Sequence, residues 1–291
     1  MKVGLLVSGQ LGLICLERIY LTGLYDVIFV VTDKKSTEIQ QFCDIYGINL
    51  YVGNPNLFKV NEFKEEIDVL LSINFLFIVK NKILNLAKLY SINIHGSLLP
   101  KYRGRSPHIW AIINNEKYTG ITAHLMTEEL DGGDIISQIK IPILKNYSGN
   151  DVLDIYKKLY PNFIIDILEK VRNNTIKLIP QDNNKATFFD KRLPIDGLVC
   201  WDWQKERIRN WVRALKEPYP GAFFINGLGD KVIINKVKFN DLGFQNSIRN
   251  GTVLSLNPLL VKTSNGVIEL ILKTQDETIF TGQILNKPNV Q

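Results

Sequence analysis

Short apolar runs alternate with helical patterns through the first third of the chain. The runs KVGLLV, DVIFVV and VLLSI are apolar at almost every position, which is typical of strands that are buried on both faces of a parallel sheet. The segments LGLICLERIYL and STEIQQFCDIYG between them carry apolar residues at helical spacing. Repeated strand-helix-strand units of this kind predict an α/β fold with a doubly wound, mostly parallel, Rossmann-like sheet.

The pattern changes beyond about residue 190 of the 291-residue chain. Residues 151–172 still have the spacing of a long amphipathic helix, but KVIINKVKF, TVLSL, LLVKT and VIELILK alternate apolar and polar residues between turn signals. A chain of this length is expected to form two domains. We therefore predict an α/β domain over residues 1–190 and a small C-terminal all-β, OB-like barrel over residues 191–291.

The composition indicates an ordinary globular protein of the cytoplasm. Glu17 and Arg18 interrupt the apolar start of the chain before the roughly 20 residues that a membrane span needs, so no membrane partner is expected. Three scattered cysteines suit neither a disulfide framework nor a Cys-x-x-Cys metal site, which favours a reducing compartment. The net charge is +6, with the surplus mostly after residue 190, where it could bind phosphates or be solvated surface.

The most informative polar residues are Asn93 and His95, which lie two positions apart at the predicted carboxyl end of a strand. Their side chains therefore face the same side, at the sheet edge where ligands bind. An amide can donate a hydrogen bond to an oxyanion, and an imidazole can take a proton from an amine, so the pair suits acyl transfer. Asp131, in a glycine-rich turn, could return to this edge and orient the imidazole. Either motif by itself would be explained by structure alone.

Together, however, the two motifs resemble a known signature. The segment NIHGSLLPKYRG (residues 93–104), followed by LDGG (residues 130–133), is similar to that of the formyltetrahydrofolate-dependent transferases. The resemblance implies a doubly wound formyltransferase domain that uses N10-formyltetrahydrofolate as co-substrate and no metal. It also implies that Asn93, His95 and Asp131 are the catalytic residues.

The resemblance places the folate in an apolar slot formed by two segments. One precedes the strand that carries the catalytic residues, and the other leads into the aspartate. The implied folate contacts are Phe75, Leu76, Phe77, Ile78, Val79, Met126, Thr127, Leu130 and Asp134. An apolar lining suits a pterin ring. For Phe75 and Phe77, a place in the hydrophobic core is a strong alternative.

Two acceptors of the formyl group are possible, a nucleotide-linked amino sugar and methionyl-tRNA. A third possibility is that the protein is a binding module without catalytic activity. The complete catalytic trio argues against such a module. The segment WDW and the residues after it, up to residue 223, resemble the domain join shared by methionyl-tRNA and sugar formyltransferases. The tRNA enzymes carry a basic insertion after the second strand and usually RGAAP after the LLP turn, whereas this chain has TDKKST and RGRSP. These departures favour a sugar enzyme of bacterial surface polysaccharide or lipopolysaccharide synthesis, and nucleic acid is not expected as a partner.

Several residues near the motif and in the domain join are candidates for binding the sugar nucleotide, because cationic side chains suit a pyrophosphate. They are Ser97, Lys101, Arg103, Gly104, Arg105, His108, Arg213 and Tyr219. For each arginine, holding the loop through backbone carbonyls is an equal alternative. His108 could instead cap a helix, Tyr219 could form a rigid turn, and His124 could be a structural histidine. The nucleotide, the sugar, the amine position and homodimer formation stay open.

Overall fold

A computed structural model describes residues 1–63 and 65–286 of the chain. The chain divides into two compact units, and each is described by itself. The first unit consists of Met1–Pro107, Thr119–Ile141 and Asp154–Asp190. The second unit contains the described residues from Lys191 onward together with residues 108–118 and 142–153. These last two segments come from the part of the sequence for which a single α/β domain was predicted.

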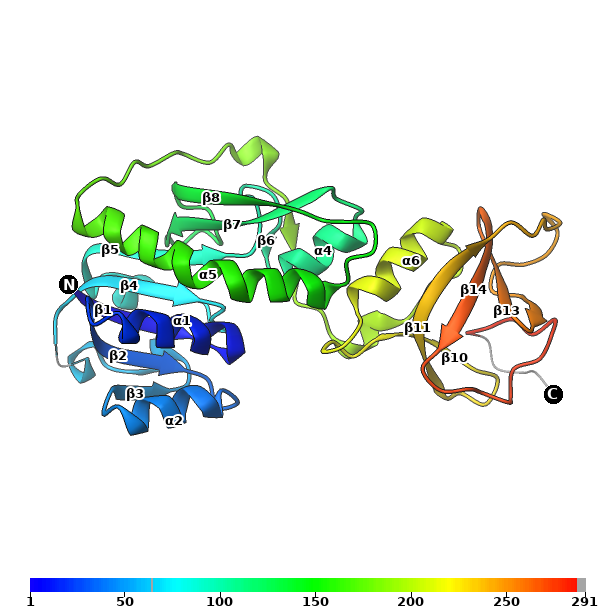
Figure 1. The fold of residues 1–291 in the computed structure, drawn as a ribbon, viewed down its shortest axis with the longest axis horizontal. Helices are drawn as coiled ribbons and strands as arrows, with labels where there is room; N and C mark the ends of the chain where they lie inside the picture. Colours follow the sequence, from blue (N-terminus) through cyan, green and yellow to red (C-terminus); the bar gives the residue numbers. More distant parts are fainter. Residues whose placement is uncertain (64, 287–291) are drawn as a thin grey trace. The chain divides into compact units, whose positions relative to one another are not determined.

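The first unit is built on a seven-stranded sheet with the order β3-β2-β1-β4-β5-β7-β8 (Figure 1). Strands β1 to β5 pair in parallel, and β7 runs antiparallel to β5. The strands are β1 (Lys2–Val7), β2 (Asp26–Thr32), β3 (Asn49–Val52), β4 (Ile67–Ile73), β5 (Ala87–His95), β7 (Tyr118–Leu125) and β8 (Ile135–Pro142). The predicted doubly wound, mostly parallel sheet is therefore confirmed. Strand order reverses between β1 and β4, and in such sheets ligands bind beyond the carboxyl ends of the strands near this point.

The three helices predicted from apolar spacing are present among the six α-helices of the described residues. They are α1 (Gly9–Leu21), α2 (Thr37–Ile45), α3 (Asn81–Leu84), α4 (Pro107–Ile113), α5 (Gly149–Arg172) and α6 (Lys205–Ala214). Short 3-10 helices are η1 (Pro55–Leu57), η2 (Val60–Glu62), η3 (Asn183–Lys185) and η4 (Pro194–Gly197). A two-stranded parallel pair joins β6 (Arg103–Gly104) to β9 (Phe188–Phe189). Within the described residues, no helix is both long enough and apolar enough to cross a membrane.

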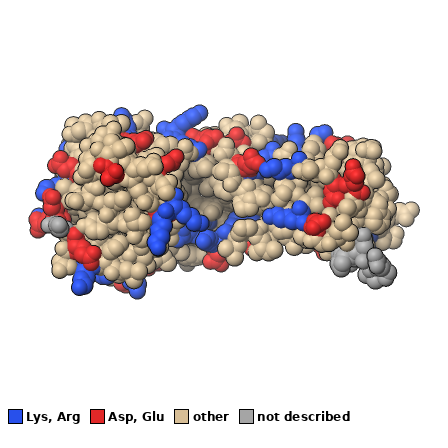
Figure 2. Space-filling view, turned by 90° about the horizontal axis from the view of Figure 1, so that it is seen from below, with Lys and Arg blue, Asp and Glu red and all other residues tan. Residues whose placement is uncertain are grey.

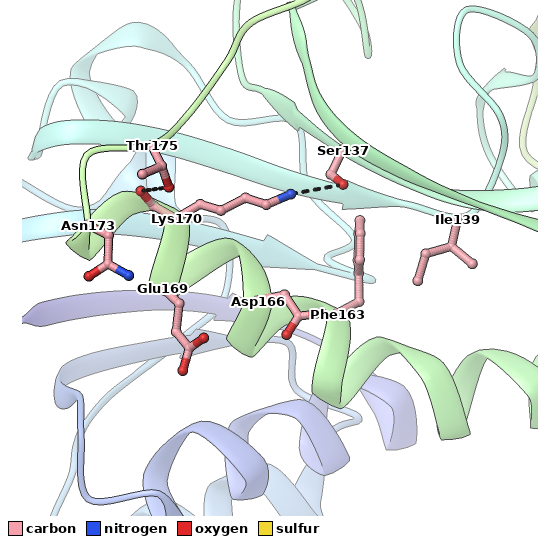
Figure 3. A pocket seen from close by; sticks show the side chains of 8 residues that line it. All are labelled: Ser137, Ile139, Phe163, Asp166, Glu169, Lys170, Asn173 and Thr175. Atoms are coloured by element: carbon pink, nitrogen blue, oxygen red, sulfur yellow. Dashed lines mark hydrogen bonds between the residues drawn. The ribbon is translucent and has the colours of Figure 1, made fainter.

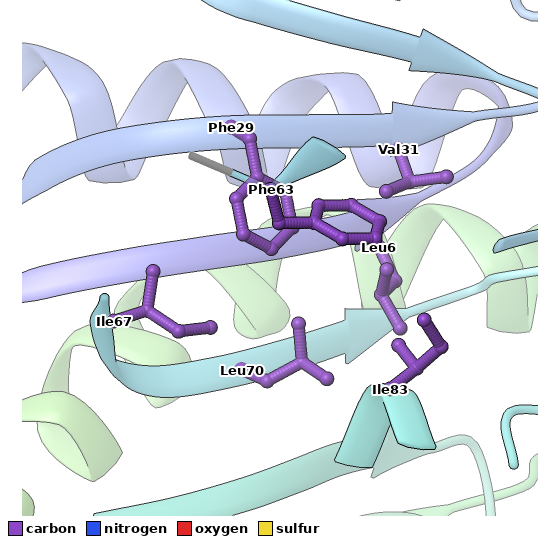
Figure 4. Close-up of a cluster of buried hydrophobic side chains, with 7 residues drawn as sticks. All are labelled: Leu6, Phe29, Val31, Phe63, Ile67, Leu70 and Ile83. Atoms are coloured by element: carbon purple, nitrogen blue, oxygen red, sulfur yellow. The ribbon is translucent and has the colours of Figure 1, made fainter. Parts of the chain in front are cut away.

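Aliphatic and aromatic side chains from β1, β2, β4, α3 and the segment before β4 form one buried cluster on the sheet (Figure 4). Its members are Leu6, Phe29, Val31, Phe63, Ile67, Leu70 and Ile83. The ring of Phe29 lies directly over β1 at Gly4, where the backbone carries no side chain. The absence of a Cβ at this position therefore allows the ring to pack against the strand.

We expect Gly4→Ala to destabilise the protein, because the new Cβ would lie 2.5 Å from Cζ of Phe29 and 2.9 Å from Cδ1 of Ile67. Overpacking of this kind should lower the free energy of unfolding by about 1–3 kcal/mol, measured by chemical denaturation. Gly243→Ala is the control, since a Cβ there meets no atom within 4 Å. Equal stability of the two variants would contradict this description of the core.

The second unit contains a five-stranded antiparallel sheet with the order β10-β11-β14-β13-β12. Its strands are β10 (Ala222–Ile225), β11 (Lys231–Asn240), β12 (Val253–Leu256), β13 (Leu259–Thr263) and β14 (Gly266–Leu272). Helix α6 packs against β11 and β14. The predicted change from a parallel sheet to an antiparallel sheet along the chain is confirmed, with α6 as an added helical element.

Candidate active site

Asn93 and His95 lie at the carboxyl end of β5, as the sequence predicts. On one side β5 pairs with β4, where Ser72 is opposite Asn93. On the other side it pairs with β7, where His124 is opposite Asn93. Residues two apart in a strand face the same side, so the amide and the imidazole occupy one face of this sheet edge.

The turn between β7 and β8 brings Asp131 to the same place. Its Oδ2 lies 3.6 Å from Nδ1 of His95, and its Oδ1 lies 3.4 Å from Nδ2 of Asn93. The backbone N–H of Gly104 donates a hydrogen bond of 2.8 Å to Oδ2. The backbone of Asp131 has a φ of +49°, which is uncommon for a residue other than glycine although Asp tolerates it better than most. The structure therefore brings the three predicted residues together.

The imidazole of His95 is buried, and its two nitrogens have different neighbours. Nε2 lies 2.8 Å from the carbonyl oxygen of Tyr102. Because a carbonyl can only accept, Nε2 carries the hydrogen of this bond. In the neutral ring the lone pair is therefore on Nδ1, the nitrogen that faces Asp131.

His124 is a further polar residue of this site. Its Nδ1 donates to the carbonyl of Leu125 at 2.8 Å, so its Nε2 accepts a hydrogen bond of 3.1 Å from Nδ2 of Asn93. The same Nε2 lies 3.6 Å from Oδ1 of Asp131. The role of His124 was left open by the sequence, because its place opposite Asn93 depends on the pairing of β7 with β5.

The carboxyl group of Asp131 is strongly biased toward its charged form. Burial alone would raise its pKa, but attraction by His95 and His124 and the hydrogen bond from Gly104 outweigh burial. The pKa of Asp131 is therefore held well below its usual range. A fixed negative charge therefore lies 3.6 Å from Nδ1 of His95.

The three basic residues of the motif have different environments. Lys101 is exposed. Arg105 is partly buried, and its guanidinium donates to the backbone carbonyl of Leu76. Arg103 is fully buried, and its guanidinium donates to Glu129, Gln181 and Asn183. These contacts indicate that Arg103 and Arg105 hold loops in place rather than bind a phosphate. Lys101 is the one of the three whose side chain is exposed to solvent.

Ser97 and Gly104, the other two predicted substrate contacts in the motif, have structural roles in the loop after β5. Ser97 is buried, and its hydroxyl donates to the carbonyl of Lys101 at 2.7 Å. Gly104 has a φ of +102°, and a Cβ there would lie 2.2 Å from the carbonyl oxygen of Phe189. Only glycine fits such a position. Both residues therefore support the loop that presents the Gly104 N–H to Asp131.

His108, Arg213 and Tyr219 belong to the second unit. The hydroxyl of Tyr219 lies 2.6 Å from Nε2 of His108, and burial lowers the pKa of His108 to about 4. The guanidinium of Arg213 donates to the carbonyl of Tyr147 at 2.5 Å. Burial, with some repulsion from Arg209, lowers the pKa of Arg213 to about 10. Each of the three side chains therefore has a partner within its own unit.

The two segments predicted to line a folate slot begin beside β5. The segment after β4 contains Leu76 and Ile78, which are 45% and 69% exposed. The second segment starts at Met126, whose N–H donates to the carbonyl of Ser91, and contains Leu130, which is 48% exposed. In contrast, the side chains of Phe75, Val79 and Met126 pack against the core cluster. Phe77 contacts the ring of Phe75, while Thr127 and Asp134 lie in the turn that contains Asp131.

A separate pocket of about 400 Å³ lies between β8 and the end of α5 (Figure 3). Lys170 donates to the hydroxyl of Ser137 across it at 3.3 Å. Asn93, His95 and Asp131 do not line this pocket. Among residues 1–63 and 65–286, no three His, Cys, Asp or Glu side chains are grouped as a metal site requires. The polar cluster at the end of β5 is therefore the candidate catalytic centre.

Two family models match the chain, and so does a curated relative. A model described as formyl transferase matches residues 21–168, and one described as the formyl transferase C-terminal domain matches residues 193–283. The bifunctional polymyxin resistance protein ArnA of Wigglesworthia glossinidia brevipalpis is 34% identical over 297 residues, which cover 97% of this chain. The chain spans 43% of the length of that relative.

Solved structures show the same fold at low sequence identity. WlaRD, a sugar 3N-formyl transferase solved with dTDP and 5-N-formyl-THF, has a TM-score of 0.72 and 21% identity, over 94% of this chain and 98% of its own. The N-formyltransferase of Helicobacter canadensis, solved with folinic acid and dTDP-3-aminofucose, has a TM-score of 0.71 and 20% identity, with the same coverage. The matches of both family models and the 34% identical relative show that the chain belongs to the formyl transferase family.

Proposed function

We propose that this protein transfers a formyl group from N10-formyltetrahydrofolate to the amine of a nucleotide-linked amino sugar. The observation that carries the proposal is the convergence of Asn93, His95 and Asp131 at the carboxyl end of β5. These groups supply a hydrogen-bond donor, a proton acceptor and a fixed negative charge. Such a set matches the needs of acyl transfer to an amine.

Asn93 is placed to stabilise the negative charge that develops on the formyl oxygen. One N–H of its amide is used by Nε2 of His124, which fixes the orientation of the amide. The other is directed at Asp131 over 3.4 Å, a long contact. A formyl oxygen with developing charge is a stronger partner than this contact, so the amide N–H is available in the transition state.

His95 moves the proton. As the amine nitrogen bonds to the formyl carbon, it must lose a proton, and Nδ1 of His95 carries the lone pair that accepts it. The carbon–nitrogen bond to N10 of the folate then breaks, and N10 takes the proton from the imidazolium. Asp131 remains ionised throughout and stabilises the imidazolium from 3.6 Å. The sugar gains a formamide, and tetrahydrofolate leaves.

The donor fits the apolar side chains around this centre. Leu76, Ile78 and Leu130 are exposed on the two segments that start next to the end of β5. Exposed apolar side chains beside polar catalytic groups are typical of a site that takes a flat ring system. We therefore assign these three residues, with Phe75 and Met126 behind them, to the pterin of the donor.

The charge distribution favours a sugar nucleotide over methionyl-tRNA as acceptor. Binding a folded RNA needs a broad cationic track that contacts many phosphates. The net charge is only +6, with 35 Lys and Arg against 29 Asp and Glu, and the face drawn in Figure 2 carries side chains of both signs on a largely uncharged surface. The solved relatives bound to dTDP or dTDP-3-aminofucose point in the same direction. The three free cysteines, of which Cys15 and Cys43 are buried, are consistent with a cytoplasmic enzyme.

We expect Lys101→Ala to weaken binding of the acceptor, because Lys101 is the exposed basic residue of the motif. Losing one charge-assisted hydrogen bond to phosphate should raise the KM for the sugar nucleotide about tenfold, with a smaller change in kcat. Lys88→Ala is the matched control, since Lys88 pairs with Glu66 at the amino end of β5, the opposite end of the strand from Asn93 and His95. An unchanged KM in Lys101→Ala would remove this residue from the proposed site.

Consumption of the donor tests the proposed reaction. Purified protein is supplied with N10-formyltetrahydrofolate, and release of tetrahydrofolate is followed after adding dTDP- or UDP-linked 3-amino or 4-amino sugars or charged initiator tRNA. We expect release to depend on one of the sugar nucleotides. Release that depends on tRNA alone would instead support a methionyl-tRNA formyltransferase.

A further inference from the structure

The turn that carries Asp131 needs support from outside itself. The φ of +49° at Asp131 is a strained conformation for a residue with a side chain, and Gly132 and Gly133 follow directly. Strained backbone of this kind costs about 1–3 kcal/mol and persists only when the surroundings hold it. The carboxylate is catalytically useful only in this position, so whatever holds the turn also sets the geometry of the site.

Gln181 holds both ends of the strained turn. Its Nε2 donates to the backbone carbonyls of Asp131, at 2.8 Å, and of Gly133, at 2.7 Å. The segment that carries Gln181 is fixed beside β8, because Ile179 and Ile135 exchange two backbone hydrogen bonds of 2.8 and 2.9 Å. One side-chain amide thus bridges two carbonyls of the catalytic turn.

Arg103 fixes the other end of the Gln181 side chain. Its Nη2 and Nε donate to Oε1 of Gln181 at 2.8 and 3.2 Å, and its Nη1 donates to Glu129 at 2.7 Å. Because the guanidinium can only donate and the carbonyls can only accept, the amide of Gln181 has one possible orientation. The next residue, Gly104, donates its N–H to the carboxylate of Asp131. Arg103 is fully buried, so the guanidinium itself is shielded from water, although Glu129 is half exposed.

We propose that Gln181, locked in orientation by Arg103, is a positioning residue that holds the backbone of Asp131 so that its carboxylate faces His95 and Asn93. This inference rests on the proposed catalytic role of Asp131. Gln181 does not touch the reacting groups, and it acts through the turn. A displacement of the carboxylate by about 1 Å can cost on the order of 10²-fold in rate, so loss of the bridge should act on kcat.

Gln181→Glu tests the proposal. The variant keeps the size of the side chain and its contact with Arg103, but it has no N–H to donate and sets a carboxylate against two carbonyls. Asn183→Ala is the matched control, because Asn183 accepts a hydrogen bond from the same guanidinium at 2.7 Å, whereas the two donations to the catalytic turn come from Gln181. For each variant, kcat, both KM values and the melting temperature are measured with the acceptor that the native protein uses.

We expect Gln181→Glu to lower kcat by about 10–100-fold, with KM values changed by less than about threefold. Asn183→Ala should keep kcat within about twofold. If Gln181→Glu does not fold, Gln181→Asn carries the same test, since its shorter side chain cannot reach both Arg103 and the turn. Native-like kcat in Gln181→Glu, or an equal loss in Asn183→Ala, overturns the proposal. A native protein that transfers no formyl group to any acceptor would instead overturn the proposed function.

Discussion

His95→Gln is expected to lower kcat for formyl transfer by about 10²–10⁴-fold, because it removes the proton acceptor. The amide of glutamine can still donate to the carbonyl of Tyr102, as Nε2 of His95 does at 2.8 Å, but it has no basic nitrogen. The variant therefore separates proton transfer from support of the loop. Steady-state kinetics with saturating donor and acceptor measure the effect.

The control for this prediction is His95→Ala, which removes the base and the hydrogen bond to Tyr102 together. We expect both variants to lose most of their activity and only His95→Ala to lose additional stability, about 0.5–1.5 kcal/mol, because it removes the hydrogen bond from Nε2 to the carbonyl of Tyr102. Substantial activity in His95→Gln would mean that another group accepts the amine proton.

Asp131→Asn is expected to lower kcat by about 10³–10⁴-fold although the two side chains have nearly the same shape. A neutral amide cannot stabilise the imidazolium of His95, and it can favour the wrong tautomer, as is known for carboxylate–histidine pairs in other enzymes. The pH profile provides a second measurement. If activity rises through an imidazole-like pKa in the native enzyme and the profile does not move in Asp131→Asn, Asp131 is only a turn residue.

The depressed pKa of Asp131 also predicts how this substitution affects stability with pH. A carboxyl whose pKa is lower in the folded than in the unfolded state stabilises the fold above the unfolded pKa, which is about 3.9. That contribution is lost as the pH falls below this value toward the folded pKa. We therefore expect the stability difference between native protein and Asp131→Asn to be largest near neutral pH and to shrink in acid. A difference that is independent of pH would contradict the charge assigned to Asp131.

Local patterns in the sequence were enough to predict the sheet and to place Asn93 and His95 at the end of a strand. Continuously apolar runs identified β1, β2 and β4, because a strand that is buried on both faces carries apolar residues at successive positions. Residues two apart in a strand share a face, so the common orientation of Asn93 and His95 could also be predicted from the sequence around them. The turn containing Asp131 was identified by its glycines together with the family resemblance.

Other parts of the site depend on contacts between distant segments and had no local signal. His124 joins the site because β7 pairs with β5, and Gln181 joins it because its segment pairs with the start of β8. Arg103 has the sequence context of a phosphate ligand, but three side chains from two other segments surround its guanidinium. Similarly, residues 108–118 and 142–153 lie between elements of the first unit in sequence, yet they belong to the second.

The most direct test of the central claim is to find the formyl group on its acceptor. Native protein and His95→Gln are incubated with N10-formyltetrahydrofolate and a mixture of dTDP- and UDP-linked 3-amino and 4-amino sugars and charged initiator tRNA, and the products are analysed by mass spectrometry with fragmentation. The account predicts that the native protein adds one formyl group to the amine of a sugar nucleotide and that His95→Gln forms at least about 100-fold less of this product in the same time. Formylation of the tRNA with every sugar nucleotide unmodified would contradict it.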